Sequence, residues 1–85
     1  MTTGEQAAIA RARALGVLHD AVIGDRLVVR AHQGDGAQDA LGDLVARTAD
    51  TVTIATRRGP VVVRLADVVA AKPVPPPPPP RAPRR

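Results

Sequence analysis

The sequence has no cysteine and no aromatic residue among its 85 positions. Without cysteine there can be no disulfide bond and no thiolate metal site, and the absence fits a cytoplasmic protein. Without Phe, Tyr or Trp there is no aromatic platform on which nucleic-acid bases could stack. The core must therefore be aliphatic, and a chain of this size buries only about 60% of its unfolded surface, which makes its stability marginal.

Long apolar runs are also missing. No segment approaches the ~20 consecutive apolar residues that a membrane-spanning helix needs. Residues 1–16 carry Glu5, Arg11 and Arg13, so they lack the apolar run of a signal peptide. We therefore expect no membrane span and a cytoplasmic location.

The net charge of +4 is unevenly distributed. Residues 1–71 hold eight arginines and eight acidic residues, so the excess comes from Lys72, Arg81, Arg84 and Arg85. Electrostatic recognition of phosphate needs a clustered basic face, and the sequence of the neutral part shows none. We therefore expect another protein, rather than nucleic acid, as the partner.

Residues 1–16 predict a short α-helix. Thr2 or Thr3 can accept the N-cap hydrogen bond, with an acidic or amide side chain three residues further on, as in a capping box. The segment is rich in alanine, the strongest helix former, and Gly16 is placed to end it. Its narrow apolar stripe consists of Ala8, Ala12 and Leu15.

From residue 17 to 74 the sequence changes to short β-type segments. Strands are expected over 26–32, 41–48, 51–56, 61–65 and 69–74. Alternation of apolar residues predicts a core that includes Val29, Leu44, Val52, Ile54 and Val63.

The connections between these strands have distinct turn signals. Residues 33–38 predict a polar loop, and Arg57-Arg58-Gly59 predicts a hairpin in which the glycine can take a positive φ. Residues 65–68 are too few for an α-helix and suit a 3₁₀ turn. Gly42, inside the second strand, predicts a bulge or bend.

This order of strands and turns predicts a mostly β fold, a small SH3-like five-stranded barrel over residues 17–74. Closure would hide the edges of its valine-rich strands, and an Sm-like or OB-type barrel is the alternative. Residues 75–85 are rich in proline and arginine, so a disordered or extended polyproline II tail is expected there.

Part of the chain resembles a known module. The runs DRLVVR, DALGDLVA, DTVTIATRRGPVVV and ADVVAAKPVPP, within residues 25–76, resemble the SH3-like N-terminal module of actinobacterial GNAT-family acetyltransferases. In that family the module precedes a proline-arginine linker and a catalytic domain, and the 85 residues contain no counterpart of its acetyl-CoA-binding loop. The resemblance therefore implies an accessory barrel and not the enzyme.

Residue types that carry chemistry are sparse. His19 and His32 could be paired with Asp20 or Asp35, but zinc normally needs three or four protein ligands and these spacings match no ligand pattern. No serine or cysteine offers a nucleophile. The glycines around Asp35 are followed by a strand rather than the helix of a phosphate loop. We therefore expect no catalytic, metal or cofactor site.

The sequence thus predicts a non-catalytic binding or accessory module that contacts another protein. Two alternatives stay open: a regulator of a transporter, by distant similarity to ferrous iron transport protein A, and a weak nucleic-acid-binding barrel. The candidate contact residues are the exposed basic ones of the hairpin and the tail. They are Arg57, Arg58, Arg81, Arg84 and Arg85.

Overall fold

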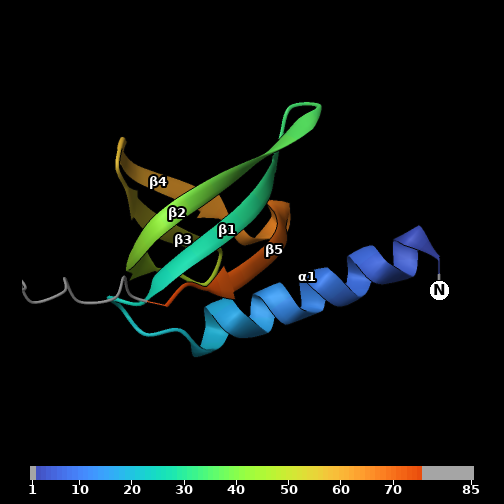
Figure 1. Cartoon of the computed structure of the whole chain (residues 1–85), viewed down its shortest axis with the longest axis horizontal. Helices are drawn as coiled ribbons and strands as arrows, with labels where there is room; N and C mark the ends of the chain where they lie inside the picture. Colours follow the sequence, from blue (N-terminus) through green and yellow to red (C-terminus); the bar gives the residue numbers. More distant parts are fainter. Residues whose placement is uncertain (1, 76–85) are drawn as a thin grey trace, which may run out of the picture.

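The structure, a computed structural model, describes residues 2–75 and consists of one helix packed on one sheet (Figure 1). In chain order the elements are α1 (Thr3–Asp20), β1 (Arg26–Gln33), β2 (Gly36–Arg47), β3 (Thr51–Thr56), β4 (Gly59–Arg64), the 3₁₀ turn η1 (Leu65–Asp67) and β5 (Val68–Pro73). The five strands, the N-terminal helix and the 3₁₀ turn expected from the sequence are confirmed. The extents of α1 and β2 differ from expectation.

Helix α1 begins as predicted but does not end at Gly16. The Thr2 side chain accepts a hydrogen bond from the Glu5 N–H, and the helix then continues to Asp20. Glycine inside a helix costs about 1 kcal/mol relative to alanine. The cost is offset because Leu18, beyond the glycine, is only 1% exposed and packs in the core.

The buried face of α1 also differs from the predicted stripe. The helix packs along β5 through Ala14 and Leu18, whereas Ala8 and Ala12 are exposed. Its N-terminal part extends past the sheet (Figure 1). With so few large apolar residues, helical periodicity alone did not identify the docking face.

The five strands form one antiparallel sheet in the order β4-β3-β2-β1-β5. The long strand β2 pairs with β1 through its first part and with β3 through its last part. β4 and β5 are the two edges of the described sheet and do not pair with each other, so the sheet is not closed. The closed barrel expected from the sequence is therefore not shown.

Two details of β2 correct the sequence prediction. The polar loop expected over residues 33–38 is a turn of two residues, because Gly34 adopts φ 56° and lets Gln33 pair with Gly36. The bulge lies at Val45, between Leu44 and Ala46, rather than at Gly42. At Gly42 any Cβ would collide with the Ala55 carbonyl oxygen, so glycine permits the close approach of β2 to β3.

The core is aliphatic, as predicted. Val29, Leu44, Val52 and Ile54 are fully buried and Val63 is 6% exposed. These side chains come from β1, β2, β3 and β4, with α1 covering them through Ala14 and Leu18. The predicted core set is therefore confirmed.

Candidate functional site

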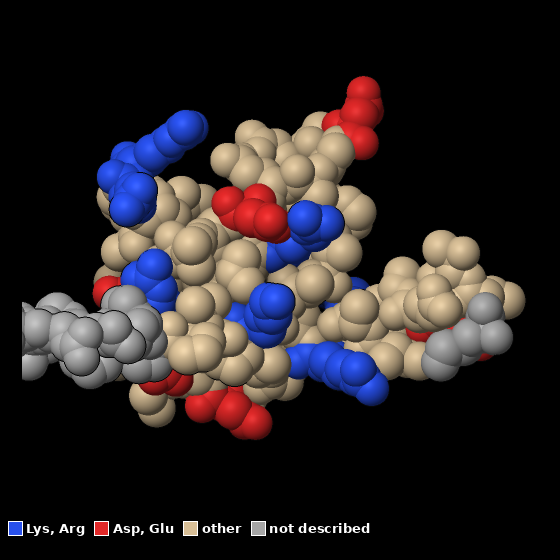
Figure 2. All heavy atoms as spheres, viewed as in Figure 1, with Lys and Arg blue, Asp and Glu red and all other residues tan. Residues whose placement is uncertain are grey.

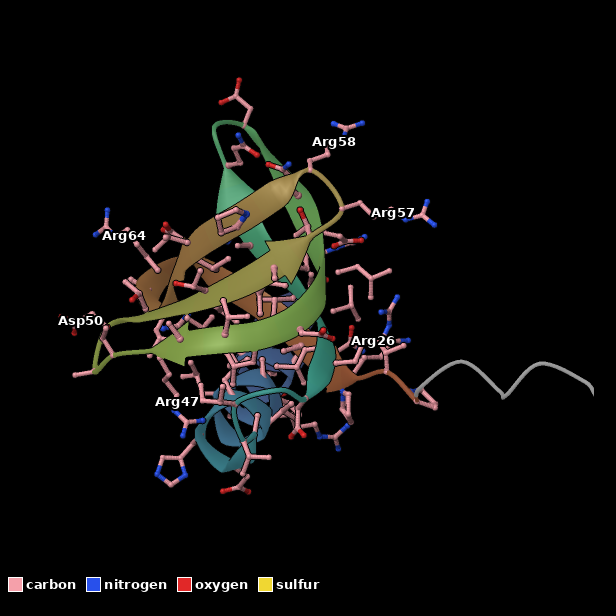
Figure 3. The ribbon with its side chains drawn as sticks, turned by 90° about the vertical axis from the view of Figure 1, so that its left-hand side faces the viewer. Arg26, Arg47, Asp50, Arg57, Arg58 and Arg64 are labelled. Atoms are coloured by element: carbon pink, nitrogen blue, oxygen red, sulfur yellow. The ribbon has the colours of Figure 1, made fainter. Side chains whose placement is uncertain are left out.

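The β3–β4 hairpin presents two of the predicted contact residues at its tip. Thr56 fixes the turn, because its hydroxyl donates to the Gly59 carbonyl at 2.7 Å and accepts from the Arg58 N–H at 3.2 Å. Gly59 has φ 119°, which favours glycine. Arg57 and Arg58 are exposed and project away from the body of the sheet (Figure 3). An ordered turn therefore holds both guanidinium groups in solvent.

This hairpin borders a groove of about 740 Å³. The opposite side of the groove is formed by residues 31–33 and 38–43 of the β1–β2 hairpin, and its lining includes the edge strand β4. Three exposed apolar side chains lie in it: Leu41 is 45% exposed, Val61 36% and Val62 64%. Exposed apolar groups gathered in a groove and bordered by polar residues make this groove the candidate interaction surface.

The charged lining of the groove has a small basic excess. Its charged residues are Arg26, Arg57, Arg58 and Arg64 together with Asp39, Asp43 and Asp67. Asp39 is neutralised from outside the groove, because its carboxylate accepts from Arg30 at 2.9 and 3.3 Å. Among residues 2–75 the other two aspartates form no ion pair, so four arginines face two free carboxylates.

The Arg30–Asp39 pair spans β1 and β2, where the two residues are directly opposite each other. The hydrogen bonds from the Arg30 guanidinium lower the pKa of the Asp39 carboxyl below its usual value. Both side chains are about half exposed, so water screens the pair and its contribution to stability is small.

Two other arginines serve to hold the helix and are not available for a partner. Arg11 of α1 donates to the carbonyl oxygens of Leu65 and Val68 at 3.2 and 2.9 Å. Arg47 at the end of β2 donates to those of Leu18 and Ala21 at the C-terminal end of α1 (Figure 3). A cation at this end of a helix also interacts favourably with the helix dipole.

The basic side chains outside the groove are dispersed. Figure 2 shows blue groups separated by red and tan ones across the face it presents, while the blue groups at the upper left project from the β3–β4 hairpin. No helix within residues 2–75 has the length and apolar character required to cross a membrane.

The two histidines lie at the surface. His19 Nδ1 is 3.1 Å from an Asp20 carboxylate oxygen, and His32 lies exposed near the end of β1. In the described part of the chain, no three histidine or acidic side chains come close enough together to hold a metal ion. A second hollow, of about 660 Å³, lies between residues 24–26 and 73–75 and contains none of the exposed large apolar side chains.

Sequence reasoning located only part of this site. Arg57 and Arg58 were predicted as contacts, whereas Arg81, Arg84 and Arg85 lie outside the described residues, as does the expected tail beyond Pro75. Leu41, Val62 and Arg64 were missed. One signal was present: residues 61–63 are three consecutive valines, and since side chains alternate between the faces of a strand, such a run places valine on both faces of β4.

Comparisons of the chain with protein-family models, with curated proteins and with solved structures give no match.

Proposed function

We propose that this chain is a non-catalytic binding module of the SH3-like kind, which contacts another protein through the groove between the β1–β2 and β3–β4 hairpins. One observation carries the proposal: Leu41, Val61 and Val62 are exposed together in a groove whose lining includes four arginines. Burial of such apolar surface drives association, and the charged groups around it confer specificity.

The strand arrangement supports the SH3-like assignment. Four strands follow one another as a meander, and after η1 the fifth strand returns to pair with β1. The resemblance of residues 25–76 to the accessory module of GNAT-family acetyltransferases supports an accessory role.

The proposal is tested by affinity capture from the cytosol of the source cells. The partners retained by the wild-type chain are compared with those retained by a groove variant. Leu41→Thr removes an apolar side chain from the groove. Val45→Thr is the matched control, because Val45 is on the same strand, is 46% exposed and does not line the groove. A partner lost with the first variant and retained by the second supports the groove as the binding surface.

A partner retained equally by both variants would contradict the proposal. Direct binding is measured by calorimetry with the purified partner and the purified chain. The identity of the partner distinguishes an acetyltransferase-associated module from a transporter regulator. Binding that is competed by short DNA or RNA instead, with strong salt dependence, would favour the nucleic-acid alternative.

The non-catalytic part of the proposal has its own test. A GNAT-type reaction requires a pyrophosphate-binding glycine-rich loop at a helix N-terminus, whereas Gly34 lies in a two-residue turn between two strands and Gly36 begins the second of them. We expect no binding of acetyl-CoA to residues 1–75 in calorimetry. Micromolar binding, or acetylation of amine substrates, would contradict this expectation.

A further inference from the structure

We propose that the partner binds through an extended, acidic segment that adds a strand to the free edge of β4. The inference rests on the proposed function and specifies the chemistry of the partner. The segment has an apolar centre and acidic side chains toward its two ends, and it occupies the groove between β4 and the β1–β2 hairpin.

Strand β4 is the uncovered edge of the described sheet. The order β4-β3-β2-β1-β5 leaves β4 and β5 as the two edges, and α1 packs along β5. Within residues 2–75, β3 is the one element that packs along β4. An exposed edge strand is a template for pairing with another chain.

The register of the hairpin identifies the free backbone groups of β4. The Leu65 N–H donates to the Asp50 carbonyl at 2.8 Å, next to the opposed residues Thr51 and Arg64. Hydrogen-bonded and non-hydrogen-bonded pairs alternate along an antiparallel ladder. Val62 is therefore in a non-hydrogen-bonded pair with Thr53, and its N–H and C=O point away from β3.

The same alternation sets the limits of the free edge. The Arg64 N–H and the Pro60 C=O also point outward, on either side of Val62. Pro60 has no N–H, which is tolerated because that position faces away from the ladder. An added strand can thus form a complete two-bond pair at Val62, with one further bond possible on each side.

The side chains around this edge define the composition of the added strand. A residue opposite Val62 has its side chain on the same face as Val62, which is 64% exposed. Its neighbours in the added strand lie on the same face as Val61, which is 36% exposed and lines the groove. The centre of the segment is therefore apolar.

Arginines at both ends of β4 determine the charge of the segment. Arg57 and Arg58 lie at the hairpin tip and Arg64 at the other end (Figure 3). Within residues 2–75 their guanidinium groups form no ion pair with a carboxylate. Arg64 is six positions after Arg58, which corresponds to about 20 Å of extended chain at 3.3 Å per residue. Acidic side chains at that spacing complement both ends, in either direction of the added strand.

The same charges disfavour two other occupants. A second copy paired through β4 and centred on Val62 would bring Arg58 of one chain diagonal to Arg64 of the other, which places like charges together. The proline-arginine segment after Pro75 is itself basic, and its prolines lack the N–H groups that strand pairing requires.

The experiment selects binders from a displayed library of random peptides of about nine residues, enough to span β4 at 3.3 Å each. Selection on the wild-type chain is followed by counter-selection on Val62→Pro. This variant removes the outward N–H without breaking the β3–β4 ladder. Val62→Thr is the matched control that keeps the N–H. We expect enriched sequences with an apolar centre and acidic ends, bound at least about tenfold more weakly by Val62→Pro than by Val62→Thr.

Two further measurements use the enriched peptide and the wild-type chain. In amide hydrogen exchange, the Val62 N–H becomes protected when the peptide binds. A peptide N-methylated at its central residue loses at least about tenfold in affinity, since it cannot donate to the Val62 carbonyl. This variant of the peptide keeps the test decisive even if Val62→Pro does not fold.

Several results would overturn the strand-addition proposal. In the selection, these results are enrichment of basic or proline-rich peptides, or no enrichment over counter-selection. In the binding measurements, they are binding that survives N-methylation, or tighter binding of oligothymidylate than of the acidic peptide. A dimer of the chain that protects the Val62 N–H without any peptide would also overturn the proposal. If any of these occurs while the Leu41→Thr variant still loses the cellular partner, the groove function stands and strand addition is wrong. If Leu41→Thr retains that partner, the groove function itself is wrong.

Discussion

Replacement of Arg11 by alanine tests how the helix is held on the sheet. The Arg11 guanidinium donates to the carbonyl oxygens of Val68 at 2.9 Å, Leu65 at 3.2 Å and Ala66 at 3.3 Å. The bonds to Val68 and Leu65 are partly buried, so they are less accessible to competing water than the exposed bond to Ala66. No backbone hydrogen bond could replace these contacts, because they connect the middle of α1 to η1 and the start of β5.

The magnitude follows from the type of hydrogen bond. A hydrogen bond to a charged group contributes about 1.5–3 kcal/mol, and the 2.9 Å bond to Val68 is the best formed of the three. We expect Arg11→Ala to lower the free energy of unfolding by about 2 kcal/mol. For a domain of this size the total is roughly 4–11 kcal/mol, and 2 kcal/mol corresponds to a fall in Tm of roughly 8–16 °C.

Arg13→Ala is the matched control, since Arg13 lies on the same helix and is exposed, and its side chain makes no hydrogen bond within residues 2–75. Its effect should stay within about 0.5 kcal/mol. Urea and thermal unfolding are followed by far-ultraviolet circular dichroism on both variants. Equal stability of Arg11→Ala and Arg13→Ala would refute the claim that Arg11 fastens α1.

Three further predictions concern the sheet. Gly42→Ala should prevent native pairing of β2 with β3, because the added Cβ collides with the Ala55 carbonyl; a dispersed amide spectrum like that of the wild type would contradict this. Ile54→Ala should lower the free energy of unfolding by about 2–5 kcal/mol, measured by urea denaturation, because Ile54 is fully buried. Asp39 should titrate below the usual range in carboxyl carbon NMR, and Arg30→Gln should restore its ordinary pKa, since the Arg30 hydrogen bonds cause the shift. Because the folded-state pKa is lowered, the small stabilisation from this pair is present above the unfolded pKa and is lost as the pH falls through the folded one.

The sequence by itself determined the strands, the β3–β4 hairpin and the core. Residues 51–56 alternate with period two, and this fixes Val52 and Ile54 on the buried face because side chains of a strand alternate between its two faces. Turn chemistry acts over two or three residues, so the β3–β4 hairpin ending in Gly59 could also be located. These signals depend on near neighbours in the chain, and the sequence contains them in full.

The tertiary structure decided the features that depend on distant residues. α1 passes Gly16 because Leu18 is buried against the sheet, and Arg47, 26 residues after Ala21, donates to the carbonyls at the end of the helix. The lining of the groove includes both Leu41 of one hairpin and Val62 of another. No local pattern encodes such a shared surface, since it depends on how the fold places the two hairpins. Arginine shows the difference most clearly: whether its guanidinium group fastens a helix or remains available to a partner depends on which carbonyls the fold brings within reach.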